Sequence, residues 1–190
     1  MMNLGKIAAV TISTSDLNKM VNAYQESLRY RVTKSGQITA QESSAWGTEN
    51  LTNADYVVMQ PEKSDDFSFR FIHQPDQSNY IAFKSVGWNA AELIVEDVDG
   101  LAVQLEDSPF KIIGSPADLS FTKDIRAMQV MGPANEILYL TQFKIKSQNL
   151  IAQSRVVLWI RPSLLSWQES LWMKCRVIFT LILSYPKRRL

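Results

Sequence analysis

The chain has 190 residues, enough for one ordinary domain or two small modules, and its 46% hydrophobic content is enough to bury a core. Its net charge is +1, but residues 1–150 carry 13 basic against 18 acidic side chains, and this acidic body without a basic stripe argues against nucleic acid as a partner. The single cysteine, Cys175, excludes an internal disulfide framework, and without a secretory signal pattern at the N-terminus we expect a cytosolic protein.

The N-terminal segment predicts a strand followed by an amphipathic helix. Residues 7–14 alternate and are rich in β-branched side chains, as in a strand. Ser15 is the expected N-cap of the helix, with Asp16 in its first turn. One apolar stripe then follows at helical spacing: Leu17, Met20, Val21, Tyr24 and Leu28.

Strand-like runs complete this unit and a second unit of the same kind. The first unit continues with strands at 30–39, 54–60 and 67–73. Residues 89–107 then predict another strand and a short helix, and further strands are expected at 110–113, 125–131 and 136–143. We therefore predict an α+β protein of two β-α-β-β-β modules, residues 1–85 and 86–146, because one such unit alone leaves a sheet face uncovered.

Three short motifs resemble a known superfamily over about residues 5–145. A strand enters "SDL", a second strand enters "VEDVD", and "GPANEILYLTQ" lies near the end, in the order and spacing of the vicinal oxygen chelate superfamily. That group includes glyoxalase I, bleomycin resistance proteins and extradiol dioxygenases. The resemblance implies a curved mixed sheet around a central cavity, and a homodimer, because relatives often dimerise.

The resemblance also implies where a divalent metal would bind, since catalytic members hold it with His, Glu or Gln from strands of both modules. The matching positions are Ala9, Ala90 and Tyr139, or Leu138 if the last strand shifts by one residue. None of these is a suitable ligand for a hard divalent ion. The only histidine, His73, is a weak candidate, because one ligand does not make a site and a histidine at a strand end usually has another role. We predict no cofactor.

Glu92 is the candidate catalytic residue. Ala91, Leu93 and Val95 form the face expected against a helix, which turns Glu92 toward the cavity. A carboxyl in that position is suited to act as a general base or to bind a cationic ligand, whereas on an edge strand in water it would have no such role. Alternation places Thr11 on the inward face of the first strand.

Aromatic residues supply the remaining candidate ligand contacts. We expect Phe69, Phe71, Trp88 and Tyr139 to offer apolar surface, with Thr11, Glu92 and Tyr139 as polar contacts. Trp46 and Trp88, each next to a glycine, are either walls of a pocket or lids over the core. Arg70 pairs either with an anionic ligand or with a surface acid, and the sequence does not distinguish the two.

Residues 147–190 form an atypical basic and hydrophobic tail. They contain three of the five tryptophans and neither glycine nor aspartate. Charges at Arg161, Lys174 and Arg176 interrupt the apolar run and argue against a membrane span, although an interfacial helix stays an alternative. Our hypothesis is that the tail is translated from a shifted reading frame, in which case we expect it to be disordered or prone to aggregation.

Three functional hypotheses follow from the sequence. The first is a metal-free protein that binds a small organic molecule in its cavity. The second is an enzyme, a metal-dependent lyase or an extradiol-type dioxygenase, whose ligands lie at other positions. The third is an interaction protein that uses its tail to reach a membrane or a partner chain.

Overall fold

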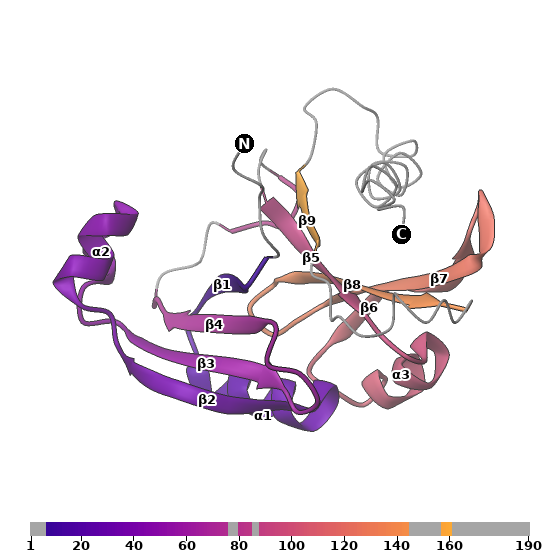
Figure 1. Ribbon diagram of the computed structural model, residues 1–190, viewed down its shortest axis with the longest axis horizontal. Helices are drawn as coiled ribbons and strands as arrows, with labels where there is room; N and C mark the ends of the chain where they lie inside the picture. The colour runs from indigo at the N-terminus through magenta and orange to yellow at the C-terminus, as the bar shows by residue number, and fades with distance from the viewer. Residues whose placement is uncertain (1–6, 76–79, 85–87, 145–156, 161–190) are drawn as a thin grey trace, which may run out of the picture.

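The structure of the protein is a computed structural model that describes residues 7–75, 80–84, 88–144 and 157–160. Its first half is a β-α-β-β-β unit with a helical excursion between the second and third strands (Figure 1). The elements are β1 (Ala9–Thr14), α1 (Leu17–Leu28), β2 (Tyr30–Gln37), α2 (Ala40–Trp46), the 3-10 turn η1 (Glu49–Leu51), β3 (Asp55–Pro61) and β4 (Ser68–His73).

The second half repeats the unit and adds one strand. Its elements are β5 (Trp88–Ile94), α3 (Val98–Leu105), β6 (Lys111–Leu119), β7 (Thr122–Met131), β8 (Ile137–Phe143) and β9 (Val157–Ile160). The predicted α+β fold of two β-α-β-β-β modules is therefore confirmed. Apart from β9, the predicted tail of residues 147–190 lies outside the described residues.

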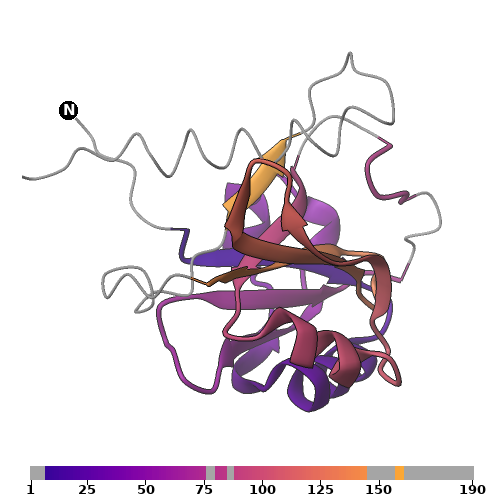
Figure 2. The same cartoon turned by 90° about the vertical axis from the view of Figure 1, so that its right-hand side faces the viewer.

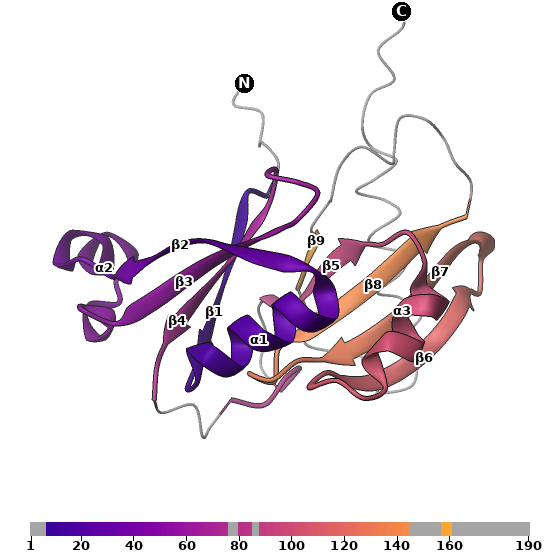
Figure 3. The same cartoon turned by 90° about the horizontal axis from the view of Figure 1, so that it is seen from below.

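The two sheets have the same strand order. The first sheet runs β1-β4-β3-β2 and the second β6-β7-β8-β5-β9, so β5 and β8 correspond to β1 and β4. In each module the first and last strands pair in parallel, and the other pairs within a module are antiparallel. The helices α1 and α3 lie on the same side of the two sheets, in front of the strands when the molecule is seen from below (Figure 3). A side view of the second module shows α3 below the strands and β9 above them (Figure 2).

The local chemistry explains where the helices begin. Asp16, not the predicted Ser15, is the N-cap of α1, and its side chain accepts a hydrogen bond from the backbone N–H of Lys19. Asp97 caps α3 in the same way through the N–H of Gly100. The N-cap of α1 thus lies one residue further along the chain than predicted, within the usual uncertainty of helix ends.

One apolar core joins the helix sides of both modules. Tyr24 of α1 is central to it, with edge-to-face ring contacts that include Phe69, Phe71 and Phe110. Since Phe110 belongs to the second module, these contacts fix the modules to each other. In the part of the chain that the structure describes, no helix is long and apolar enough to cross a membrane.

Candidate functional site

We define the inner face of each sheet as the face opposite its helix. In the first sheet it carries Thr11, Val58 and Arg70, while Val10, Met59 and Phe69 pack on the helix side. In the second sheet it carries Glu92 and Tyr139, while Ala91, Leu93, Leu138 and Leu140 belong to the core. The alternation of side chains along each strand produces this division. It places the candidate polar residues on the inner faces.

Glu92 is a buried acid on the inner face of the second sheet. Only 3% of its surface is exposed, and its Oε1 accepts a hydrogen bond of 2.6 Å from the Thr141 hydroxyl. Its other oxygen, Oε2, is buried and has no hydrogen-bond partner among the residues that the structure describes. Burial raises the pKa of Glu92 to about 7, against the opposing effect of the Thr141 bond. The alternative of an edge-strand carboxylate in water is therefore wrong.

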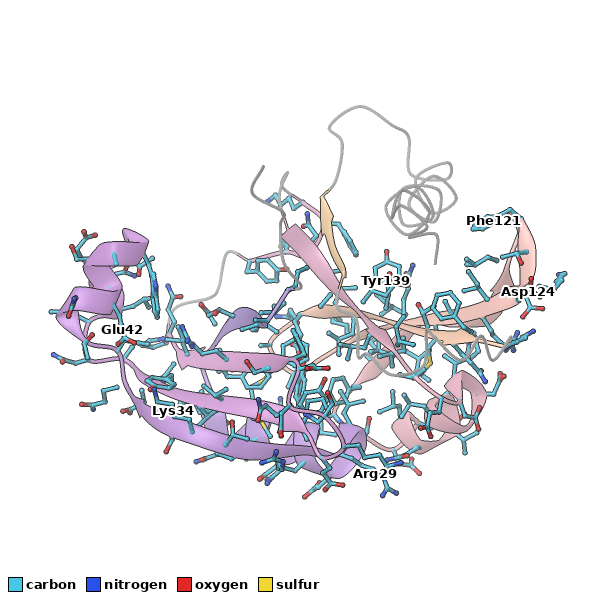
Figure 4. The ribbon with its side chains drawn as sticks, in the orientation of Figure 1. Arg29, Lys34, Glu42, Phe121, Asp124 and Tyr139 are labelled. Atoms are coloured by element: carbon cyan, nitrogen blue, oxygen red, sulfur yellow. The ribbon has the colours of Figure 1, made fainter. Side chains whose placement is uncertain are left out.

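Tyr139 lies directly beside Glu92 in the sheet. The two are Cα partners across the parallel β5–β8 ladder, and Figure 4 shows Tyr139 on the side away from α3. Tyr139 packs in a small apolar cluster with Ala90 and Ile137, and the neighbouring residues Ala82, Phe83 and Met131 pack against this cluster. The register also decides between the two predicted alignments, because Leu138 points into the core.

Glu136 is a second buried acid, and it links the two modules. Its Oε1 accepts a hydrogen bond of 3.0 Å from the Tyr24 hydroxyl, and its Oε2 accepts one of 2.8 Å from the backbone N–H of Ala134. Burial raises the pKa of Glu136 to about 7, although these bonds oppose the rise. A Cβ atom at Gly132 would overlap the carboxylate, so a larger residue there would displace Glu136 from these hydrogen bonds. This link is not apparent from the sequence, because Tyr24 and Glu136 are 112 positions apart.

The inner face of the first sheet carries a basic and aromatic cluster. The guanidinium carbon of Arg70 lies 5.1 Å from the ring centroid of Trp46 and 5.9 Å from that of Tyr56. Lys34 lies on the other flank of Tyr56, with its Nζ 5.7 Å from the ring centroid. Trp46 ends α2 and is 42% exposed, so it does not cover the core.

The sequence matches no protein-family model and no curated protein. Solved structures, however, match over most of the described chain. A glyoxylase/bleomycin resistance protein/dioxygenase domain from Frankia sp. EAN1pec has a TM-score of 0.59 at 12% identity, covering 77% of this chain and 97% of that one. A glyoxalase family protein from Bacillus cereus has a TM-score of 0.55 at 13% identity, covering 75% and 96%. Glyoxalase I from Zea mays has a TM-score of 0.54 at 14% identity, covering 72% of this chain and 44% of its own.

The chain has the vicinal oxygen chelate fold. At these identities the likeness establishes the fold and leaves the activity open, and the chain spans less than half of maize glyoxalase I. The structure thus confirms the resemblance that the three sequence motifs indicate.

The positions that the resemblance assigns to metal ligands do not fit a metal ion. Ala9 and Ala90 offer only methyl groups, and Ala90 and Tyr139 pack in an apolar cluster. His73 follows Phe69 and Phe71 in the alternation of β4, which places it on the helix side, away from Arg70. Among the described residues there is no group of three or more His, Cys, Asp or Glu side chains that is able to hold a metal.

Phe69 and Phe71, two of the predicted ligand contacts, lie on the helix side of the first sheet, packed against Tyr24. That side is opposite the inner face that carries Arg70. The prediction treats them as aromatic surface without using the alternation that separates them from Arg70. Thr11 is exposed on the inner face as expected, next to Arg70 in the β1–β4 ladder. Trp88 begins β5, and its side chain lies outside what the structure describes.

Proposed function

We propose that this vicinal oxygen chelate protein binds a small organic molecule against the inner faces of its sheets, without a metal ion, and that Glu92 is a polar contact. The observation that carries the proposal is the unpartnered Oε2 of Glu92. A buried polar atom without a hydrogen bond costs about 1–3 kcal/mol. A ligand that forms a hydrogen bond with Oε2 recovers part of that cost, and this gain favours binding at Glu92.

The protonation of Glu92 sets the kind of contact. With a pKa of about 7, the carboxyl is largely protonated in slightly acidic solution and is then able to donate a hydrogen bond from Oε2. Thr141 already occupies Oε1. We expect a ligand carbonyl or hydroxyl at Oε2, because an acceptor complements the neutral acid.

A ligand screen with matched variants tests this proposal. A library of small organic acids, amides and alcohols is tested for stabilisation of the full chain in thermal unfolding, since a ligand at one hundred times its Kd adds about 2.7 kcal/mol. Ligands of the wild type are then titrated by calorimetry into Glu92→Leu, Thr141→Val and Glu26→Gln. Leucine, unlike glutamine, has no group that donates a hydrogen bond to the ligand. Glu26 is an exposed residue of α1, so its variant is the control for a change of charge.

We expect weaker binding in the Glu92 and Thr141 variants and unchanged binding in the Glu26 variant. Equal affinity in all four proteins would remove Glu92 from the site. The metal-free part of the proposal is measured separately by elemental analysis of the purified chain. One equivalent of iron, zinc, manganese or nickel that resists dialysis would favour the lyase or dioxygenase hypothesis instead.

A cytosolic location and a homodimer stay predictions. Light scattering coupled to gel filtration measures the assembly, and fractionation of the cells that express the protein measures the location.

A further inference from the structure

The cluster on the inner face of the first sheet consists of Lys34, Trp46, Tyr56 and Arg70, and we call it the basic–aromatic cluster. Arg70 lies within 6 Å of two ring centroids, and Lys34 lies within 6 Å of one of them. These are distances at which a cation is attracted to the face of an aromatic ring. Figure 4 labels Lys34 near this end of the first sheet, below α2.

The strand register and the packing of the first sheet hold the side chains of the cluster in position. Across the sheet, Val58 is the Cα partner of both Lys34 and Arg70, so the two cations flank it in one row. The Tyr56 ring lies against Gly36, where a Cβ atom would come within 3.3 Å of the phenol oxygen. Tyr56 itself belongs to a small buried cluster with Ile38 and Ile72, and Leu51, Ala54 and Val58 pack against this cluster.

The helix α2 holds Trp46 in place over Arg70. It begins with a capping box, in which the Thr39 hydroxyl accepts from the N–H of Glu42 and the Glu42 carboxylate accepts from the N–H of Thr39. Its C-cap is Gly47, the residue after Trp46, whose φ of 66° suits glycine. Both ends of this short helix are therefore fixed by hydrogen bonds, and Trp46 is its last residue.

The two cations of the cluster have no carboxylate partner. Among the described residues, no acid lies within salt-bridge distance of Lys34 or Arg70, whereas Arg126 of the second module pairs with both Asp99 and Asp118. The nearby acid is Glu42, whose pKa is lowered mainly by its hydrogen bonds from Thr39, with smaller contributions from Arg70 and Lys34. Glu42 keeps its negative charge in the capping box, but this one acid stands against two cations, so the cluster keeps an excess of positive charge.

We infer that the basic–aromatic cluster binds the carboxylate of a small organic anion. A guanidinium that stacks against aromatic rings still has its N–H groups in its own plane, where they form two parallel hydrogen bonds to a carboxylate. Lys34 adds a second positive charge, and the exposed part of Trp46 offers apolar surface to the body of the ligand. This inference rests on the proposed function and adds the chemical class of the ligand.

The test compares three probes that share one aromatic body. Naphthalene-2-carboxylate, naphthalene-2-carboxamide and 2-naphthyl phosphate are titrated into the full chain by calorimetry at fixed ionic strength. We expect the carboxylate to bind at least tenfold more tightly than the amide, because only the anion complements the two cations. Tighter binding of the phosphate than of the carboxylate would overturn the assignment to carboxylates.

Four variants then locate the binding. Arg70→Gln is expected to weaken carboxylate binding by about tenfold to a hundredfold. Arg70→Lys is expected to weaken it by less, because lysine keeps the positive charge but loses the paired N–H groups of the guanidinium. Lys34→Gln is expected to weaken it severalfold. Lys19→Gln, on the exposed side of α1, is the charge control and is expected to bind as the wild type does. Circular dichroism of each variant checks that it is folded.

The outcomes separate this inference from the proposed function. Unchanged carboxylate affinity in the Arg70 and Lys34 variants would overturn the inference, and so would equal affinity for the carboxylate and the amide. If Glu92→Leu alone weakens binding, the proposed function stands and the carboxylate site fails. If the Arg70 variants weaken binding and Glu92→Leu does not, the carboxylate site stands and the role of Glu92 fails.

Discussion

Replacing Glu92 by glutamine tests whether its carboxyl is held in the fold as a buried acid. Burial raises its pKa from 4.5 to about 7, and a change of one pKa unit corresponds to about 1.4 kcal/mol. The folded protein therefore binds this proton more tightly than the unfolded chain does. The resulting stabilisation is fully present at low pH and is lost as the pH rises from about 4.5 to about 7. Ionising Glu92 inside the fold costs about 3 kcal/mol by this reasoning.

The assay is urea denaturation of the wild type and of Glu92→Gln, followed by circular dichroism at several pH values from 5 to 8. Glutamine keeps the shape of the side chain and an acceptor for the Thr141 hydroxyl, and it does not titrate. As the pH rises over this range, the free energy of unfolding of the wild type is expected to fall by about 2–3 kcal/mol more than that of the variant. Glu136, whose pKa is also about 7, is present in both proteins, so its contribution cancels in the comparison.

Two results would refute the reasoning. Parallel stability profiles of the two proteins would mean that Glu92 is not buried as an acid. If the free energy of unfolding fell more steeply with rising pH in the variant than in the wild type, the folded state would stabilise the ionised Glu92 carboxylate. Glu26→Gln, with its exposed side chain, is expected to follow the wild-type profile.

Three further predictions concern the stability of the fold, each measured by chemical denaturation. Tyr24→Phe is expected to lower the free energy of unfolding by about 1–3 kcal/mol, because it leaves the buried Glu136 without its hydroxyl donor. Tyr30→Phe is expected to lower it by less, because the buried Tyr30 makes no such bond to the described residues. Gly132→Ala is expected to cost about 1–3 kcal/mol, because the new methyl group overlaps the Glu136 carboxylate; an unchanged unfolding midpoint would contradict this packing. Asp97→Ala is expected to cost about 1 kcal/mol through loss of the N-cap of α3, and a neutral effect would show that the cap contributes nothing.

The regular elements follow from the sequence where their signal is periodic. The apolar stripe of residues 17–28 predicts α1, because burial of one helix face needs that spacing. The helix α2 is not predicted, since its seven residues, AQESSAW, have no apolar stripe. Its signal is in the ends instead, in the capping pair Thr39 and Glu42 and in Gly47. Short helices are marked by their caps more than by their faces.

The candidate site depends on strand faces and on partners that are far apart in the chain. The face of Glu92 is predictable because its neighbours Ala91 and Leu93 are apolar and pack against the helix side. Phe69 and Phe71 pack in the core on the helix side, and the sequence alone does not distinguish this role from a ligand contact, because an aromatic side chain suits both. The environment of Arg70 is not predictable from the strand alone, since Trp46 comes from a helix that precedes β3.

The two modules share one topology and carry opposite chemistry on their inner faces. The first sheet presents two cations, Lys34 and Arg70, that pair with no carboxylate within the described part of the chain. The second presents an acid, Glu92, whose charge is suppressed by burial. Electrostatics thus favours an anion at the first sheet, and hydrogen bonding favours a neutral acceptor at the second. A ligand long enough to bring a carboxylate to Arg70 and a carbonyl or hydroxyl group to Glu92 would complement both sheets. Such a ligand would depend on Arg70 wherever its own carboxylate is ionised and on Glu92 only where the Glu92 carboxyl is protonated, so its affinity should fall as the pH rises through about 7.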